Sequence, residues 1–294
     1  MSILKTVTPV THDLGNFQVR RAVPSVGCRM VGPFVFIDQF GPARLDPGQG
    51  MDVRPHPHIG LATVTWLFEG AIEHRDSLGT DSVIRPGTVN LMTAGKGIVH
   101  SERSPETERK DGPALYGMQT WLALPDGKEE IEPAFEAVSD LPVIEYSGAR
   151  ARIIMGTLWG ETAPTTTYCD TINAEIQLMP GGMIPIDAET EERALMLVGG
   201  QATLDGETML PYDLVVLKPG AAMELSSTEG GLIFLMGGEA FSAQRHVYWN
   251  FVSSSRDRIE QAKEDWRMRR FPVVPGDDKE FIPLPKTPKT VSYP

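Results

Sequence analysis

The chain has 294 residues, of which 41% are hydrophobic and 22% charged, which excludes a disordered chain and allows two domains of ordinary size. Its 27 basic and 39 acidic residues give a formal net charge of −12, and the one basic cluster is Arg267, Arg269 and Arg270, so direct binding to nucleic acid is not expected. Cys28 and Cys169 are too few for a disulfide framework, and no stretch approaches the roughly 18 apolar residues of a membrane span. Without an apolar signal segment at its N-terminus, the chain is expected to be cytoplasmic.

The first half of the chain has the texture of antiparallel β-structure. Residues 17–125 contain short runs rich in β-branched and aromatic residues, such as PFVFIDQFGP and LATVTWLFEG, with turn residues about every 8–12 positions. No helical pattern separates these runs, which favours a barrel or sandwich over a parallel sheet. The acidic stretch 126–140 then reads as a connection between domains.

The same texture returns over residues 142–238. The segments LVGGQATLDG and LKPGAAMEL echo LFEGAIEHRDSLG and IRPGTVNLM of the first half, which indicates two copies of one β-unit. We therefore predict a first barrel over residues 1–128, a second barrel over residues 129–245, and a tail of helix and extended chain over residues 246–294 that packs on the barrels.

A helix is predicted in this tail from Ser254 to Arg267. Ser254 and Asp257 have the spacing of a capping box, in which the side chains at the helix start satisfy free backbone amides. One face of the helix is apolar and is expected to pack on a barrel; it consists of Ile259, Ala262 and Trp266. The Pro-rich residues that follow are expected to be extended.

Two short motifs, RPHPHIG and GIVHSE, carry chemistry. Alternate residues of a strand point to the same face, so His56 and His58 project together, as do His100 and Glu102. Two strands of one barrel could bring these pairs opposite each other, giving three imidazoles and one carboxylate at one point. A single histidine in a β-protein is most often a surface residue or a hydrogen-bonded core residue, but two such pairs favour a site for one divalent metal such as Fe, Mn, Co, Ni, Cu or Zn.

The two runs around these motifs, RPHPHIGLATVTWLFEGAIEHRDSLG and PGTVNLMTAGKGIVHSE, resemble the signature of the pirin family within the cupin superfamily. The resemblance is dense over the first barrel and looser over the second barrel and IEQAKEDW. It implies an all-β fold of two tandem cupin-type antiparallel barrels with a C-terminal helix. It also implies one metal in the first barrel, with Fe(II) favoured, held by three histidines and one glutamate. Those ligands fall on His56, His58, His100 and Glu102.

The resemblance implies two alternative functions. Some pirins are flavonol dioxygenases (quercetinases), so the chain could be an iron-dependent dioxygenase that cleaves the heterocycle of quercetin with O2. Glu102 would then be the catalytic base that accepts the proton of the flavonol 3-hydroxyl. The alternative is a non-enzymatic regulatory protein that binds transcriptional or metabolic partner proteins in response to its metal or redox state. The depth and access of the pocket decide whether a flavonol fits, and both functions could hold.

Two further expectations concern the remaining histidines. His74 lies at the end of the strand that follows the first histidine pair, and two roles stay open for it. It could support the metal site from behind or carry a proton, or it could bond to a neighbouring turn built by Asp76 and Ser77. No histidine occurs between His100 and His246, so the second barrel is predicted to lack metal and to have a filled or apolar interior.

Overall fold

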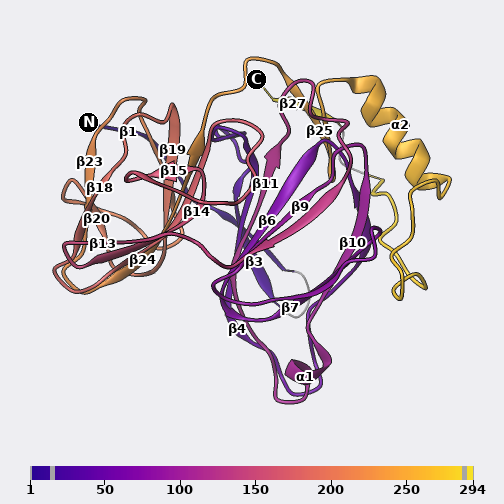
Figure 1. Ribbon diagram of the computed structural model, residues 1–294, viewed down its shortest axis with the longest axis horizontal. Coiled ribbons are helices and arrows are strands. Elements are labelled where there is room, and N and C mark those ends of the chain that lie inside the picture. The colour runs from indigo at the N-terminus through magenta and orange to yellow at the C-terminus, as the bar shows by residue number, and fades with distance from the viewer. Residues whose placement is uncertain (1, 14–16, 287–289, 294) are drawn as a thin grey trace. The chain divides into compact units, whose positions relative to one another are not determined.

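Antiparallel strands make up most of the fold, in the two regions that the sequence predicts (Figure 1). The computed structural model describes residues 2–13, 17–286 and 290–293. Contacts divide the chain into two compact units. One, here called the histidine unit because it holds all six histidines, comprises His12–Val19, Phe40–Ala137 and Phe241–Pro294. The other, the companion unit, comprises Met1–Thr11, Arg20–Gln39 and Val138–Ala240.

The first β-region is built on two sheets. The strands of its seven-stranded sheet are, in spatial order, β12 (Ala134–Val138), β9 (Val89–Thr93), β6 (Leu61–Gly70), β11 (Ala114–Ala123), β4 (Phe34–Arg44), β3 (Gln18–Val23) and β2 (Val10–Asp13). Those of its four-stranded sheet are β5 (Asp52–His58), β10 (Ile98–Arg103), β7 (Ile72–Asp76) and β8 (Asp81–Ile84). A short helix, α1 (Glu106–Arg109), follows β10.

The histidine unit has an apolar core whose residues come from both of these sheets. Leu67 and Leu115 come from the seven-stranded sheet, and Ile72 and Ile84 come from the four-stranded sheet; all four belong to one buried cluster. Strand β6 is buried from Leu61 to Leu67 without alternation, because the side chains on both of its faces are covered. This packing removes apolar surface from water and fixes how the strands that carry the histidines stand against the larger sheet.

The companion unit repeats the arrangement of a larger and a smaller sheet. Its seven-stranded sheet has the order β1 (Ile3–Val7), β22 (Leu214–Leu217), β19 (Glu192–Gly200), β24 (Gly231–Gly238), β17 (Thr171–Leu178), β14 (Ala149–Met155) and β13 (Val143–Tyr146). Its four-stranded sheet has the order β18 (Met183–Ile186), β23 (Met223–Ser226), β20 (Thr203–Leu204) and β21 (Glu207–Thr208), and a separate hairpin is formed by β15 (Thr157–Leu158) and β16 (Glu161–Thr162).

The two units are not continuous stretches of chain. Strand β1 pairs with β22, so residues 3–7 lie in the sheet of the companion unit rather than in a first barrel over 1–128. The segment Phe241–Pro294 belongs to the histidine unit. A strand joins whichever sheet edge offers it free backbone groups, and the order of strands along the chain does not reveal that edge. The contact-based units and the predicted limits divide the chain differently. The barrel limits 1–128, 129–245 and 246–294 stay a prediction.

The C-terminal helix is α2 (Arg256–Arg267), which begins two residues after the predicted start and ends at the predicted residue. Ser255, in an extended conformation, is the N-cap, and its Oγ accepts the amide hydrogen of Arg258 at 3.3 Å. The prediction that Ser254 caps the helix is wrong, because its amide and hydroxyl both donate to the Glu129 carboxylate at 2.6 Å. The predicted apolar face of Ile259, Ala262 and Trp266 is confirmed. It packs in one cluster with Ile59, between β5 and β6, and Val99 of β10.

Around α2, the rest of the C-terminal segment is extended. A three-stranded sheet has the order β26 (Phe251–Ser253), β25 (Arg245–Tyr248) and β27 (Val291–Tyr293). The indole of Trp266 donates to the Ile282 carbonyl at 3.0 Å, and the Ile282 amide donates to the Pro55 carbonyl at 2.9 Å. The segment after the helix therefore contacts β5 directly beside His56. In the described parts of the chain, no helix has both the length and the apolar character to cross a membrane.

The acidic stretch 126–140 is more than the connection that the sequence indicates. Its residues Ala134–Val138 form β12, which joins β9 at the edge of the seven-stranded sheet, and the chain passes to the companion unit only at Val138. The buried side chain of Arg245 contacts the first residues of this stretch. Arg245 is 1% exposed and binds the carboxylates of Asp126 at 2.8 Å and Glu129 at 3.3 Å. The negative charges that resemble a solvated linker thus serve to neutralise a buried guanidinium.

Replacing Arg245 with alanine is expected to lower the free energy of unfolding by about 3 kcal/mol, since the largely buried ion pair with Glu129 is lost and a cavity remains. Urea denaturation of the purified variant measures this. Arg150→Ala is the matched control, because the Arg150–Glu145 pair is exposed on both sides and is worth at most about 1 kcal/mol. Equal denaturation midpoints for the two variants would contradict the structural role given to Arg245.

Candidate metal site

Three of the four predicted ligands come together between paired strands. His56 and His58 lie on β5 and His100 lies on β10, and in the antiparallel ladder His100 stands opposite His56 while Ile98 stands opposite His58. Because side chains alternate along a strand, all three imidazoles project to the same face. One ring nitrogen of each lies within 4.8 Å of the others, and the three residues are at most 6% exposed. Three converging nitrogen donors can hold a metal ion.

Hydrogen bonds fix which ring nitrogen of His56 is free. The Nδ1 of His56 lies 2.9 Å from the Arg54 carbonyl oxygen, which can only accept, so Nδ1 carries the proton and Nε2 carries the lone pair. The Nε2 atoms of His58 and His100 face each other at 3.0 Å. Two nitrogens bound at about 2.1 Å to one metal, at about a right angle, are about 3.0 Å apart, so this spacing fits a shared ion.

The environment keeps these imidazoles neutral. Burial lowers the pKa of His56 to about 4, and burial together with the neighbouring imidazoles lowers the pKa values of His58 and His100 well below the usual value. A neutral imidazole is the form that binds metal. The buried Nδ1 of His58 has no hydrogen-bond partner among the described residues. The three imidazoles therefore fit a divalent metal held by one ring nitrogen from each histidine.

Glu102 lies beside the three histidines but does not join their group of mutually close ligand atoms. The ladder between β10 and β5 shifts register between His100 and Glu102, which places Glu102 opposite Val53. Its Oε1 accepts a hydrogen bond from the Gln119 Nε2 at 2.7 Å. Burial raises the pKa of the Glu102 carboxyl, against the opposing effects of His74 and Gln119. The roles of Glu102 as fourth ligand and as base therefore stay predictions.

Two residues of β11 complete the surroundings, and the sequence analysis did not single out either for the site. Gln119 orients Glu102, and the Trp121 ring meets the His58 ring edge-on at 5.1 Å between centroids. Both residues alternate onto the same face of β11. A polar glutamine inside the run ALYGMQTWLALP was the signal that could have identified this face.

The structure shows a contact for each of the two roles that the sequence left open for His74. His74 is 2% exposed, and its Nδ1 lies 3.4 Å from the Nδ1 of His100. Its Nε2 lies 3.1 Å from the Asp76 carboxylate, and its ring stacks on Phe135 at 4.6 Å. His74 therefore stands behind His100 of the candidate metal site and is also bonded to Asp76. Asp76 also builds the predicted turn, since its Oδ1 accepts from the backbone amides of Leu78 and Thr80.

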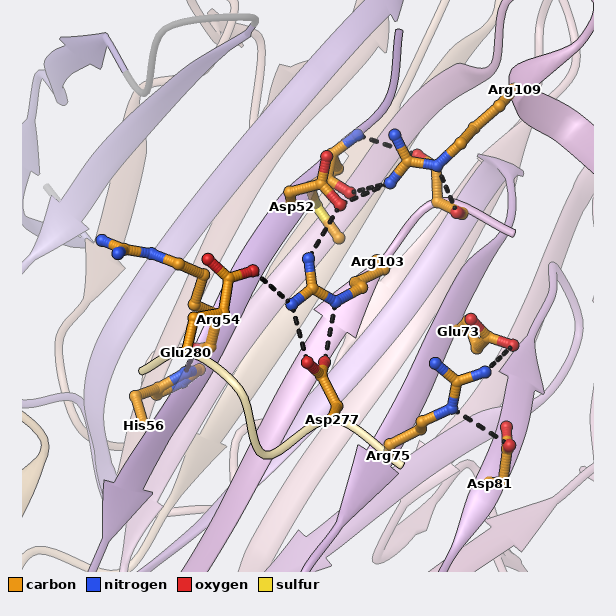
Figure 2. A network of polar contacts seen from close by, with 12 residues as sticks. Asp52, Arg54, His56, Glu73, Arg75, Asp81, Arg103, Arg109, Asp277 and Glu280 are labelled. Carbon is orange, nitrogen blue, oxygen red and sulfur yellow. Dashed lines mark hydrogen bonds and ion pairs between the residues drawn. The ribbon is translucent and has the colours of Figure 1, made fainter. Parts of the chain in front are cut away.

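The opposite face of the same small sheet carries an ionic network, shown in Figure 2. Arg103 follows Glu102 and points the other way, where it binds Asp277 through two hydrogen bonds of 2.7 and 2.9 Å, and also Glu280 and Asp52. These bonds, Asp277 foremost, raise the pKa of Arg103. A cavity of about 610 Å³ opens on this face; its lining includes Glu73, Arg75, Arg103 and Arg109 and none of the histidines. The network connects the C-terminal segment to β10 through Arg103. It lies on the face of the sheet opposite the three histidines.

Two tandem β-units, each with a larger and a smaller antiparallel sheet, and a buried three-histidine cluster in one of them, define a bicupin with a candidate metal site. The chain belongs to the pirin family: the family model described as Pirin matches residues 16–122, and that of the Pirin C-terminal cupin domain matches residues 173–272. The family and the cupin-type fold expected from the sequence are thus confirmed.

Three relatives show how far the similarity extends. A pirin-like protein of Caulobacter vibrioides is 46% identical over 93% of this chain and 96% of its own length. A Pseudomonas aeruginosa protein named "Putative quercetin 2,3-dioxygenase" is 36% identical over 96% of this chain and 91% of its own length. The crystal structure of quercetin 2,3-dioxygenase from Acinetobacter baumannii superposes with a TM-score of 0.90 at 32% identity, covering 98% of each chain.

Proposed function

We propose that this chain is a metal-dependent dioxygenase that opens the heterocycle of flavonols such as quercetin with O2, with Fe(II) as the favoured metal. The observation that carries the proposal is the buried cluster of His56, His58 and His100, whose ring nitrogens converge. Burial lowers the pKa of all three imidazoles, which favours the neutral form that binds metal. The similarity along the full chain to a quercetin 2,3-dioxygenase supports the choice of reaction. The ligand set accepts Zn, Mn, Ni, Co or Cu as well, so availability also determines loading.

The chain's own residues would divide the work as follows. The metal, when bound, acidifies the flavonol 3-hydroxyl and mediates electron transfer between flavonol and O2. The three histidines hold it, and their burial keeps bulk water from the site. Glu102 takes the 3-hydroxyl proton at Oε2, because Oε1 is already held by Gln119. Trp121, whose ring lies against His58, offers an apolar edge to the aromatic rings of the substrate.

Protein loaded with Fe(II) is expected to consume O2 and quercetin together in air, while the metal-free protein consumes neither. An oxygen electrode and the loss of the quercetin absorption band measure the two reactants in one experiment, and elemental analysis gives the metal content. The reaction proposed here is refuted if fully loaded protein takes up O2 no faster than metal-free protein. The regulatory alternative, binding to a partner protein, stays a prediction.

A further inference from the structure

A chain of three buried polar side chains runs behind the metal site. Strands β7 and β10 are paired so that Asp76 stands opposite His100 and His74 stands opposite Glu102. All three members of the chain are at most 2% exposed. The links are 3.4 Å from His100 Nδ1 to His74 Nδ1 and 3.1 Å from His74 Nε2 to Asp76 Oδ2.

Only one placement of protons satisfies every link. The Nε2 of His100 faces the cluster and needs its lone pair for a metal, so the His100 proton sits on Nδ1 and is donated to the Nδ1 of His74. The His74 proton then sits on Nε2 and is donated to Asp76. In the opposite tautomer of His74, two N–H groups would face each other at 3.4 Å and a lone pair would face a carboxylate.

We propose that Asp76, acting through His74, is a positioning residue that fixes the tautomer and ring orientation of His100 at the metal site. The inference rests on the metal site of the proposed function, not on its substrate. Carboxylates bonded to metal-binding histidines orient the ring and raise the basicity of the ligand. Here the His74 imidazole lies between the Asp76 carboxylate and His100. The Arg54 carbonyl does the same for His56 directly, and stacking on Phe135 holds the plane of His74.

A purely structural role for Asp76 makes a different prediction. Its Oδ1 supports the turn after β7 by accepting from Leu78 and Thr80, and Asp76→Asn keeps an oxygen for those two bonds. The new amide group, however, faces the Nε2 of His74 with a donor, which forces the opposite tautomer on His74 and sets it against His100. Asp76→Asn thus distinguishes support of the turn, which it retains, from the hydrogen-bonded link through His74 to His100, which it disrupts.

The test measures metal binding, with Co(II) as the probe because its absorption reports on the ligands. Asp76→Asn is expected to retain wild-type circular dichroism, to bind Co(II) about 10–100-fold more weakly in a chelator competition, and to shift the Co(II) bands. Asp81→Asn, on the neighbouring strand β8 and ion-paired with Arg75, is the control and should match wild type. Wild-type affinity and spectrum in Asp76→Asn would overturn the proposal, and so would a wild-type chain that binds no Co(II).

A second measurement needs no variant. Long-range ¹⁵N–¹H spectra of the Zn(II)-loaded wild-type protein should show His74 protonated at Nε2 and His100 at Nδ1. A proton on His74 Nδ1 would overturn the proposal even if Asp76→Asn fails to fold. Failure of the dioxygenase reaction is distinguishable, because a chain that binds metal with these tautomers but leaves quercetin intact refutes the reaction and not the positioning role.

Discussion

Replacing His58 with alanine is expected to reduce metal content from about one ion per chain to nearly none and to abolish oxidation of quercetin. His58 and His100 face each other through Nε2 at 3.0 Å, so replacing His58 removes one of the two donors of this pair. Partners that only support a ligand from behind contribute about 10–100-fold to metal affinity, and loss of a ligand itself should exceed that. Elemental analysis and chelator competition measure the content and the affinity.

Two further variants separate loss of the ligand from loss of the fold. Alanine leaves a cavity beside Trp121, so His58→Gln, which fills more of the space without an imidazole, should also lose the metal while melting closer to wild type. His12→Ala is the matched control, since His12 lies on the exposed strand β2. Full metal occupancy in both His58 variants would show that the ion binds elsewhere.

Replacing Glu102 with glutamine is expected to lower kcat for quercetin by about 10²–10⁴-fold, the usual contribution of a general base. The substitution keeps the shape of the side chain and the oxygen that accepts from Gln119, but it removes the proton acceptor. Steady-state kinetics on protein of known metal content measures the effect. Glu132→Gln is the control, because Glu132 is exposed and pairs with Lys96 on the surface.

The same variant distinguishes the two roles predicted for Glu102. If Glu102 is both ligand and base, metal affinity and kcat fall together. If it is a base alone, metal content stays at the wild-type level while kcat falls. Wild-type kcat in metal-loaded Glu102→Gln would contradict the base role.

Local sequence pattern was sufficient for the features that depend on neighbours along the chain. The alternation of side chains in a strand places His56 with His58, and the helical repeat places Ile259, Ala262 and Trp266 on one face, in agreement with the structure. The N-cap of α2 was missed by one residue because Ser254 and Ser255 are equally good caps in isolation. Ser255 is the cap in the structure, whereas Ser254 is bound by Glu129, which lies 125 residues away in the sequence.

Tertiary structure alone decided how remote strands meet. The sequence by itself determined an all-β chain with two histidine motifs, since period-two patterning and turn residues act over a few positions. It did not determine the register that sets His100 opposite His56, the irregularity that turns Glu102 toward Gln119, or the pairing of β7 with β10 that puts His74 and Asp76 behind His100. Those contacts join residues 17 to 44 positions apart, and a one-residue slip in register would send every side chain to the other face. The two motifs were enough to predict the candidate metal ligands, whereas the residues proposed to position them, His74 and Asp76, could be identified only from the strand pairing of the folded chain.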